Sequence, residues 1–385
     1  MSSKKLLIVA GESSGELYGG LLACQLKDSF ELIGIGGKYM QAAGVSLIGN
    51  ITHAFGAFEV VGHFKKIKEN FKAAESALES IDGLILIDFP DFNLKLATKA
   101  KKLNKKVLYY VSPQIWAWRK GRIKKIKECV DFMATILPFE EDIYKKAKIP
   151  SKFVGHPMYE LMNEELGYWL KVENTSLGTL RENLRKKFNI TKNTVITLMP
   201  GSRPSEIKRK ISLMVNIIKT FDRDKIHFLI PKAPNIEFSE EIKQILSSFE
   251  NLTILNEQAF TALAMSDLAV ITSGTSTLQA ALLQIPMIVI YKVNPCSYFI
   301  GKILIKGVKH IALPNVIADF TGIEDIRIPE FIQHLDVKKI TEEIDHILCD
   351  EDYRKKTSTF LSKISKFFEG KEASKEVAAI CKQLF

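Results

Sequence analysis

Two acidic residues follow apolar runs of the kind that build the buried strands of a parallel sheet. Asp88 comes directly after residues 83–87 and before Pro90, so its carboxyl group is expected at a strand tip beside a rigid turn. Partial burial there raises a carboxyl pKa towards working pH, which suits a general base. Glu12 follows the first apolar run, residues 6–10. The alternative is that these acids serve as ordinary turn or helix-cap residues.

The first loop, GESSGE at residues 11–16, opens a helix expected over residues 12–28. Its glycines allow a ligand close to the backbone, but the loop matches neither the Walker A pattern nor GxGxxG. Its two acids disfavour phosphate and favour hydroxyl groups. Ser13 and Glu16 have the spacing of a capping box, which is the simpler interpretation. After the strand that ends near Asp88, Asp91 is a candidate helix cap and Asn93 a candidate for orienting a neighbour.

Two loops in the second half combine small residues with hydroxyl groups. One follows the apolar run 195–199, and the other, SGTST at residues 273–277, follows the run 268–272. Backbone N–H groups and hydroxyls at a helix start, with one arginine from a facing loop, can hold a diphosphate without a metal. Either loop alone is also compatible with a plain turn. The candidate ligands of the diphosphate are Gly201, Ser202, Arg203, Ser273, Gly274, Thr275 and Ser276.

Residues 111–119, VSPQIWAWR, contain two of the three tryptophans and run into a basic helix. Trp116, Trp118 and Arg119 have the composition of a membrane interface. Aromatic side chains among basic ones also stack on nucleic-acid bases. A third interpretation is a buried tryptophan pair beside a solvated basic face.

An apolar stretch runs from Phe58 to Phe71, and Phe64, Ile67 and Phe71 recur in it at helical spacing. One interpretation is a groove for an acyl chain, lined by residues that include Phe58, Val61, Phe64 and Ile67. The other is the core-facing side of an amphipathic helix. His63 has no second ligand at metal spacing, so no metal site is expected.

Two sheets are needed to position these residues. Short apolar runs alternate with longer charged segments, which is the pattern of a parallel α/β fold. The pattern pauses in the polar stretch 162–193 and then restarts. We therefore expect two doubly wound Rossmann-like domains, residues 1–185 and 186–350, that face each other across a cleft with ligands at the carboxyl ends of the strands. A helical C-terminal tail, residues 351–385, is expected to pack back on the first domain.

Composition narrows the class of protein. Hydrophobic residues are 46% and charged residues 25%, as in globular domains. The formal net charge of +10 favours a polyanionic partner. Five isolated cysteines without a CxxC pair fit a reducing cytoplasm. No apolar run has the length of a membrane span, so membrane contact is expected to be peripheral.

Taken together, the segments resemble the lipid-A-disaccharide synthase family, glycosyltransferases of the GT-B type. The resemblance spans residues 7–315. The matching segments, in chain order, are VAGESSGE, GIGGKYMQAAG, IDFPDFN, YVSPQIWAWR, LPFE, FVGHPM, MPGSR, SGTSTLQ and LPNVIA.

The resemblance implies inverting transfer of a diacylglucosamine unit from UDP to the 6-hydroxyl of lipid X. It implies that Asp88 is the catalytic aspartate and that Glu12 occupies the acidic position of the first loop. Arg203 falls on the nucleotide-phosphate arginine, and SGTST falls on the nucleotide loop. Asn315 falls on the asparagine of the LPN segment and is assigned with the acceptor. The stretch from Phe58 to Phe71 falls on an apolar surface for the acceptor lipid.

One position departs from the pattern of GT-B enzymes, which often have a glutamate on the ribose hydroxyls where this chain has Gln279. An amide oxygen accepts more weakly than a carboxylate, so this contact is expected to be weaker. The resemblance implies UDP-diacylglucosamine and lipid X as substrates, with no cofactor and no metal. It also implies a cytoplasmic enzyme on the anionic inner membrane surface that does not bind nucleic acid, and it leaves a homodimer open.

Two other functions remain as alternatives. A UDP-N-acetylglucosamine 2-epimerase uses a similar pair of domains without a lipid. A non-enzymatic basic protein that binds membrane or RNA explains the charge and the tryptophan loop, but not Asp88 at a strand tip.

Overall fold

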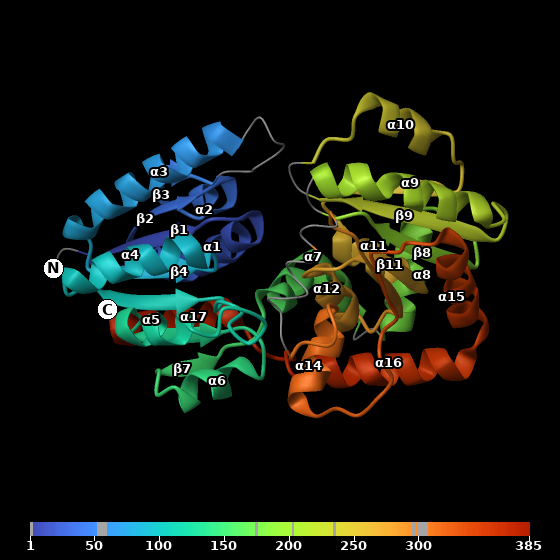
Figure 1. Ribbon diagram of the computed structural model, residues 1–385. Coiled ribbons are helices and arrows are strands. Elements are labelled where there is room, and N and C mark those ends of the chain that lie inside the picture. The colour runs from blue at the N-terminus through green and yellow to red at the C-terminus, as the bar shows by residue number, and fades with distance from the viewer. Residues whose placement is uncertain are drawn as a thin grey trace. The chain divides into compact units, whose positions relative to one another are not determined.

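The computed structural model describes residues 3–51, 60–173, 176–201, 204–233, 236–294, 298 and 307–385, and within these the side chains of residues 60–64, 170–173 and 204–205 are not described. The chain forms two compact units (Figure 1). The first contains Met1–Pro157 and Gly370–Phe385, and the second contains most of the chain between them. Each unit is a parallel sheet with helices on both faces.

The first unit has a seven-stranded parallel sheet in the order β3-β2-β1-β4-β5-β6-β7. Its strands are β1 Lys5–Ala10, β2 Glu31–Gly36, β3 Ser46–Asn50, β4 Gly83–Ile87, β5 Lys106–Tyr110, β6 Phe132–Thr135 and β7 Ser151–Phe153. Its helices are α1 Ser13–Leu26, α2 Lys38–Ala42, α3 Val60–Ala77, the 3-10 turn η1 Leu78–Ser80, α4 Pro90–Lys102, α5 Arg122–Cys129, α6 Glu140–Lys146 and α17 Ala373–Leu384.

The second unit has a six-stranded parallel sheet in the order β10-β9-β8-β11-β12-β13. Its strands are β8 Thr194–Met199, β9 Ile226–Lys232, β10 Leu252–Asn256, β11 Leu268–Thr272, β12 Met287–Tyr291 and β13 Glu330–Ile332. Its helices are α7 Pro157–Glu173, α8 Leu177–Lys187, α9 Pro204–Thr220, α10 Glu240–Ser247, α11 Ala259–Met265, α12 Ser276–Leu282, α14 Leu313–Thr321, α15 Val337–Cys349 and α16 Glu351–Ser365.

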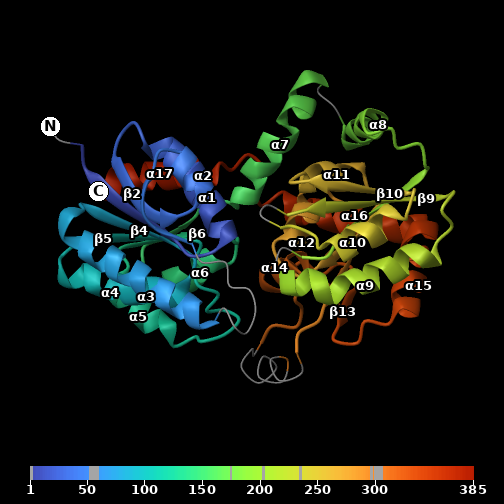
Figure 2. The ribbon, with the colours of Figure 1, turned by 90° about the horizontal axis from the view of Figure 1, so that it is seen from above.

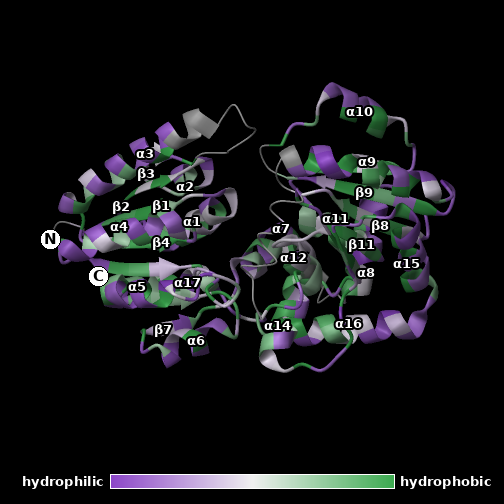
Figure 3. Ribbon diagram, in the orientation of Figure 1, coloured by the Kyte–Doolittle hydropathy of each residue, from purple (hydrophilic) through white to green (hydrophobic). Residues whose placement is uncertain are grey.

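The hydrophobic pattern explains both sheets. The central strands β4 and β11 are buried along their whole length, because helices cover both faces. Figure 3 shows these strands in green, whereas the ribbons of outer helices such as α4 and α9 carry both purple and green residues. The two sheets therefore match the predicted doubly wound fold. The short edge strands β3, β7 and β13 are strands that the sequence pattern did not reveal.

The units divide the chain at other points than the sequence indicated. Helices α7 and α8 belong to the second unit, although residues 158–185 were expected in the first. Specific contacts hold them there: Thr261 N donates to Glu165 Oε1 at 2.7 Å, and Arg185 Nη2 pairs with Asp267 Oδ2 at 2.7 Å. The polar stretch 162–193 predicts a domain boundary, but two of its charged residues tie α7 and α8 to the second unit.

The C-terminal tail also divides differently. Helix α16 packs against α12 and α14 of the second unit, so the expected return at residue 351 begins only at Gly370. Helix α17 then packs against α1 and β5, as the red helix beside the blue ones in Figure 2 shows. Lys152 Nζ and Glu376 Oε2, 2.6 Å apart, pair β7 with this last helix.

Candidate active site

Each sheet has one point at which the strand order reverses, and the expected site residues flank both points. In the first sheet β1 and β4 pair side by side although two strands separate them in sequence, and Ala10 lies opposite Ile87. In the second sheet β8 and β11 pair in the same way, with Met199 opposite Ile271. The loops after paired strands splay apart at such a point and leave a crevice for ligands.

Asp88 sits at the tip of β4 in a strained backbone conformation. Its φ is 49° and that of Phe89 is 47°, both in the left-handed region that non-glycine residues avoid. The backbone carbonyl of Asp88 accepts hydrogen bonds from Tyr109 Oη at 2.6 Å and Asn93 Nδ2 at 2.7 Å. Asn93 thus orients its neighbour, as the sequence suggested. These bonds hold the turn that follows β4.

Burial raises the pKa of Asp88 to about 6, and the charge of Glu12 contributes in the same direction. The backbone N–H of Phe89 lowers this pKa in part. Glu12 itself is exposed and is the residue that precedes α1. In the structure the two predicted acids therefore lie close enough for the charge of Glu12 to raise the pKa of Asp88. A carboxyl group with a pKa near 6 matches the requirement for a general base near neutral pH.

The expected capping box of the first loop is not present. Glu16 is buried and accepts a hydrogen bond from Tyr39 N at 2.8 Å, so it joins α1 to α2 rather than closing its own helix. Asp91 likewise does not cap α4, because Phe89 occupies the cap position. Gly11 is needed for a close approach: a Cβ at this position would lie 2.2 Å from the Phe89 ring.

Tyr18 and Tyr109 lie near Asp88 and His156 packs against Tyr18, and the sequence pattern did not single these three residues out. Tyr18 is 2% exposed, and its hydroxyl has no hydrogen-bond partner in the described part of the chain. Burial and the charge of Asp88 raise the pKa of Tyr18. His156 packs edge-on against Tyr18 with ring centroids 5.9 Å apart, and burial lowers its pKa to about 3, so it is neutral. Tyr18 follows Gly15 by three residues in α1, so helical spacing places it on the same side of the helix as this glycine of the first loop.

The two tryptophans of the basic loop have different environments. Trp116 is buried, and its Nε1 donates to Glu140 Oε1 at 3.0 Å, so its expected place on an acceptor or membrane surface is wrong. Burial raises the pKa of Glu140 to about 7, although its hydrogen bonds lower it. Trp118 is partly exposed and lies against two arginines, with Arg119 Cζ 4.4 Å from its ring centroid. Trp118 and Arg119 therefore stay candidates for ligand binding.

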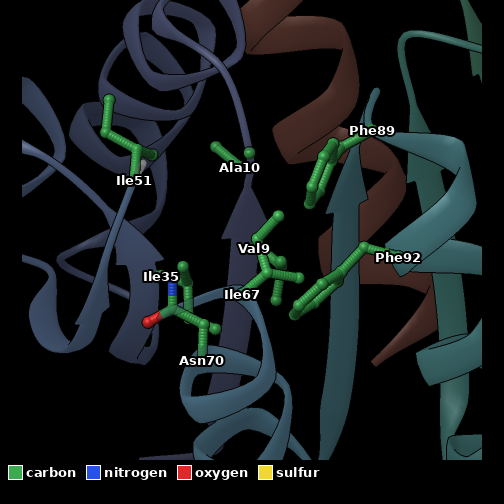
Figure 4. Close-up of a pocket in the computed structure, with 9 residues that line it drawn as sticks. Val9, Ala10, Ile35, Ile51, Ile67, Asn70, Phe89 and Phe92 are labelled. Carbon is green, nitrogen blue, oxygen red and sulfur yellow. The ribbon is translucent and has the colours of Figure 1, made fainter. Parts of the chain in front are cut away.

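Helix α3 presents part of the expected apolar stretch. Ile67 packs with Phe71 against the core of the first unit and lines a small apolar cavity, together with Phe89 and Phe92 (Figure 4). The cavity volume is about 10 Å³, roughly the space of one water. An acyl chain would require these side chains to move. Phe58 lies outside the described residues, as do the side chains of Val61 and Phe64.

In the second unit, the loop after β8 turns at Gly201, where φ is +119°. The backbone angle favours glycine, and a Cβ there would lie 2.4 Å from Glu206 Oε2, so the Glu206 side chain would have to shift as well. Glu206 stands in the first turn of α9. Ser202 and Arg203 lie outside the described residues, so their expected contacts stay predictions.

The loop after β11 leads directly into α12. Gly274 has a φ of +152° and, like Thr275, is exposed. Ser273 Oγ donates to Ile311 O at 3.0 Å, and Leu313 N donates to Thr277 Oγ1 at 3.1 Å. These bonds fasten the loop to the segment before α14. Ser276 and Gln279 are partly buried in α12, where their expected nucleotide contacts stay predictions.

Asn315 does not lie where an acceptor could contact it. Its side chain is fully buried: Nδ2 donates to Ile328 O and to Glu330 Oε1, each at 2.9 Å, and Oδ1 accepts from Ile328 N at 2.9 Å. Glu330 also accepts from the backbone of Ile311 and Ala312. The expected acceptor contact is therefore replaced by a structural role. Asn315 and Glu330 hold the segment that supports the loop of Ser273.

Comparisons with known proteins identify the family. The family model described as "Lipid-A-disaccharide synthetase" matches residues 6–382. The chain belongs to this family. The lipid-A-disaccharide synthase of Sulfurihydrogenibium sp. (strain YO3AOP1) is 38% identical over 336 residues, which cover 82% of each chain. That of Coxiella burnetii (strain RSA 331 / Henzerling II) is 35% identical over 394 residues, 100% of this chain and 99% of the relative.

Solved structures show the fold of this family member. The UDP-GlcNAc 2-epimerase of Neisseria meningitidis superposes with a TM-score of 0.63 at 12% identity and covers 98% of this chain and 100% of that chain. MurG of Acinetobacter baumannii gives 0.57 at 12% identity, with 99% of both chains covered. At such low identity the likeness concerns the fold alone. The lipid-A-disaccharide synthetase fold seen here is the expected GT-B class, with a helical C-terminal segment.

Two further observations concern this synthetase. Among the residues the structure describes, no three or more His, Cys, Asp or Glu side chains gather where they could hold a metal ion. In the same ranges no helix combines the length and hydrophobicity needed to cross a membrane.

Proposed function

We propose that this chain transfers a 2,3-diacylglucosamine unit from UDP to the 6-hydroxyl of lipid X, which yields a β-1,6 disaccharide 1-phosphate and UDP. Family membership supports the reaction, since the curated relatives are lipid-A-disaccharide synthases. The observation that carries the proposal for this chain is Asp88. Its carboxyl group has a pKa of about 6 at the point where the strand order of the first sheet reverses.

The proposed step is a single displacement with inversion. Asp88 takes the proton of the acceptor 6-hydroxyl while that oxygen attacks the anomeric carbon of the donor. The bond from this carbon to the UDP oxygen breaks, and UDP leaves with the electron pair. Glu12 raises the basicity of Asp88 through its charge. No metal is proposed for this step.

The second unit is proposed to hold the leaving diphosphate. The support is the matching position of two loops, after β8 and β11, at the reversal point of the second sheet. Gly201, Ser202 and Arg203 would act from one loop, and residues 273–276 with Gln279 from the other. Backbone N–H groups and one guanidinium stabilise the charge that develops on the leaving group.

Lipid handling is proposed for the first unit. Ile67, in the apolar wall of α3, lines a water-sized apolar cavity on the same edge of the sheet as Asp88, and the side chains that line it would have to move apart to admit one end of an acyl chain. Phe58, Val61 and Phe64 complete the proposed surface. We also propose that the enzyme works in the cytoplasm on the anionic face of the inner membrane, and a homodimer is left open.

The decisive assay uses purified protein with UDP-diacylglucosamine and lipid X in mixed micelles, with products followed by mass spectrometry. The expected product is the disaccharide 1-phosphate with stoichiometric UDP. A parallel reaction with UDP-N-acetylglucosamine alone tests the epimerase alternative, which the fold by itself permits. Formation of the 2-epimer without any disaccharide would overturn the proposal.

A further inference from the structure

Arg119, in the loop after β5, and Arg122, the first residue of α5, form an organised cationic group, which we call the arginine pair. Arg119 Nη1 donates to Asp91 Oδ1 at 2.7 Å, and Arg122 Nη2 donates to the same oxygen. Both guanidinium groups also lie against the ring of Trp118, at 4.4 and 5.4 Å from its centroid. We propose that the arginine pair binds the phosphate monoester of the acceptor lipid. This inference rests on the proposed function.

The charge and the donors of the arginine pair fit an anion. Two guanidinium groups and one carboxylate leave a net charge of +1, and Lys120, Lys124 and Lys125 lie within a few residues of the pair in the sequence. Each guanidinium has five N–H donors, so most of them stay available after one bond to Asp91. A phosphate monoester carries close to two negative charges near neutral pH and matches the forked geometry of arginine.

The arginine pair is also held in place before a ligand arrives. The Arg122 side chain is 14% exposed, and Arg119 has a φ of 52°, a strained backbone conformation. Contact with the Trp118 face restricts both side chains further. Fixed donors lose less conformational entropy on binding than free surface lysines do.

The arginine pair lies on the same edge of the sheet as the proposed base. Asp91 is in the first turn of α4, three residues after Asp88. The charge of Arg122 acts on Tyr109, whose hydroxyl donates to the backbone carbonyl of Asp88 at 2.6 Å. An acceptor sugar that presents its 6-hydroxyl to Asp88 can therefore place the phosphate at its opposite end on the arginine pair. A membrane phospholipid has no hydroxyl group that must reach Asp88 at the same time. We therefore infer that the acceptor occupies the arginine pair.

The test compares two acceptors, lipid X and the same diacylglucosamine without its phosphate, in wild type, Arg122→Ala and Arg122→Lys. With lipid X, kcat/KM of Arg122→Ala is expected to fall by about 10- to 100-fold. With the dephosphorylated acceptor, wild type is slow already, and the substitution should change the rate by less than about twofold. Arg122→Lys keeps the charge but loses the fork, so an intermediate loss is expected.

The control is Lys102→Ala, an exposed lysine at the other end of α4, which should leave both rates unchanged. Thermal unfolding and the Kd for UDP check that Arg122→Ala folds. An equal loss on both acceptors would overturn the inference, because the role would then be structural. A loss that appears only when the micelles contain anionic phospholipid would assign the arginine pair to the membrane instead. If wild type transfers to neither acceptor, it is the proposed function that fails.

Discussion

The reversal points of the two sheets are built from opposite kinds of residue. At the first point the residues with positive φ are Asp88 and Phe89, which carry side chains and are therefore strained. At the second point they are Gly201 and Gly274, with φ of +119° and +152°, angles that glycine adopts without strain. A residue that acts as a base must carry a side chain, so neighbouring residues have to stabilise its strained backbone conformation. A loop that offers backbone N–H groups to a diphosphate needs no side chain and can use glycine.

The neighbours that hold the first point are specific. Tyr109 and Asn93 donate to the Asp88 carbonyl, and the Phe89 ring lies directly on Gly11. In the second unit, the bond from Leu313 to Thr277 and the network of Asn315 with Glu330 support the loop from behind. The comparison predicts that substitutions at the first point mainly change chemistry, and that substitutions at the second mainly change donor binding or stability.

The largest effect is expected for Asp88→Asn. Asparagine tolerates the left-handed backbone, so the turn should survive while the base is lost. Removal of a general base lowers kcat by about 10²- to 10⁴-fold. Steady-state kinetics with lipid X measure this, and calorimetry with UDP should show an unchanged Kd. Near-normal turnover would mean that Asp88 is not the base and that the first point resembles the second.

The next largest effect is expected for Gly201→Ala. Alanine at a φ of +119° is strained, and its Cβ would meet Glu206, for a combined cost of about 1–3 kcal/mol. The Kd for UDP should rise by about tenfold or more if the loop contacts the diphosphate. Gly178→Ala in α8 is the matched control, since its Cβ has ordinary space, at 3.7 Å from Ser176 Oγ. Unchanged UDP affinity with lowered stability would show that this loop supports only the fold.

Asn315→Ala distinguishes a structural role from a contact with the acceptor. The substitution leaves the backbone of Ile328 and a carboxylate oxygen of Glu330 without their buried partner, which costs about 1–3 kcal/mol. Thermal unfolding should show this loss, and KM for the acceptor should change by less than the Kd for UDP. A large rise in acceptor KM at unchanged stability would restore the role that the sequence assigned.

Much of the fold was predictable because the signals are local. Buried runs such as residues 83–87 and 268–272 are apolar along their whole length, and each ends in a loop that the sequence marks with Asp88 or Gly274. The exceptions have a physical reason. The short edge strand Ser151–Phe153 has too few residues to show a pattern. The domain boundary was missed because Glu165 and Arg185, which look like solvated charges in sequence, bond across to α11 and Asp267.

Site features were predictable where they depend on local sequence, and not where they depend on contacts between segments that are distant in the chain. The position of Asp88 at a strand tip was predictable because the apolar run before it is visible in the sequence. Tyr18 and His156 were not, because only the fold brings α1 and the segment after β7 together. Trp116 was assigned to a surface on composition, but its indole N–H finds Glu140, 24 residues away and buried. A buried partner of this kind leaves no trace in local spacing.

The smallest predicted effect tests the electrostatic part of the comparison, through Glu12→Gln. Since the pKa of Asp88 is about 6, kcat/KM should rise with pH through about 6 and then level. Burial is the larger cause of this value, and the charge of Glu12 adds to it by disfavouring the ionised form of Asp88. Removing that charge should lower the pKa, so the acid limb should move to lower pH by a fraction of a unit, because Glu12 is exposed and screened by salt.

The same sign applies to stability. Asp88 binds its proton more tightly in the folded chain than in the unfolded one, where its pKa is near 3.8. Ionising it therefore costs folding free energy as pH rises from about 4 to about 6, and Glu12→Gln should reduce that cost. Glu79→Gln, an exposed acid at the opposite end of the sheet, is the control and should leave the pH profile unchanged. The acid limb of the kcat/KM profile could instead move to higher pH, or shift equally at high and low salt. Either result would mean that Glu12 acts by contact with the substrate. In that case both loops of the first reversal point would contact the ligand directly, as is proposed for the two loops of the second.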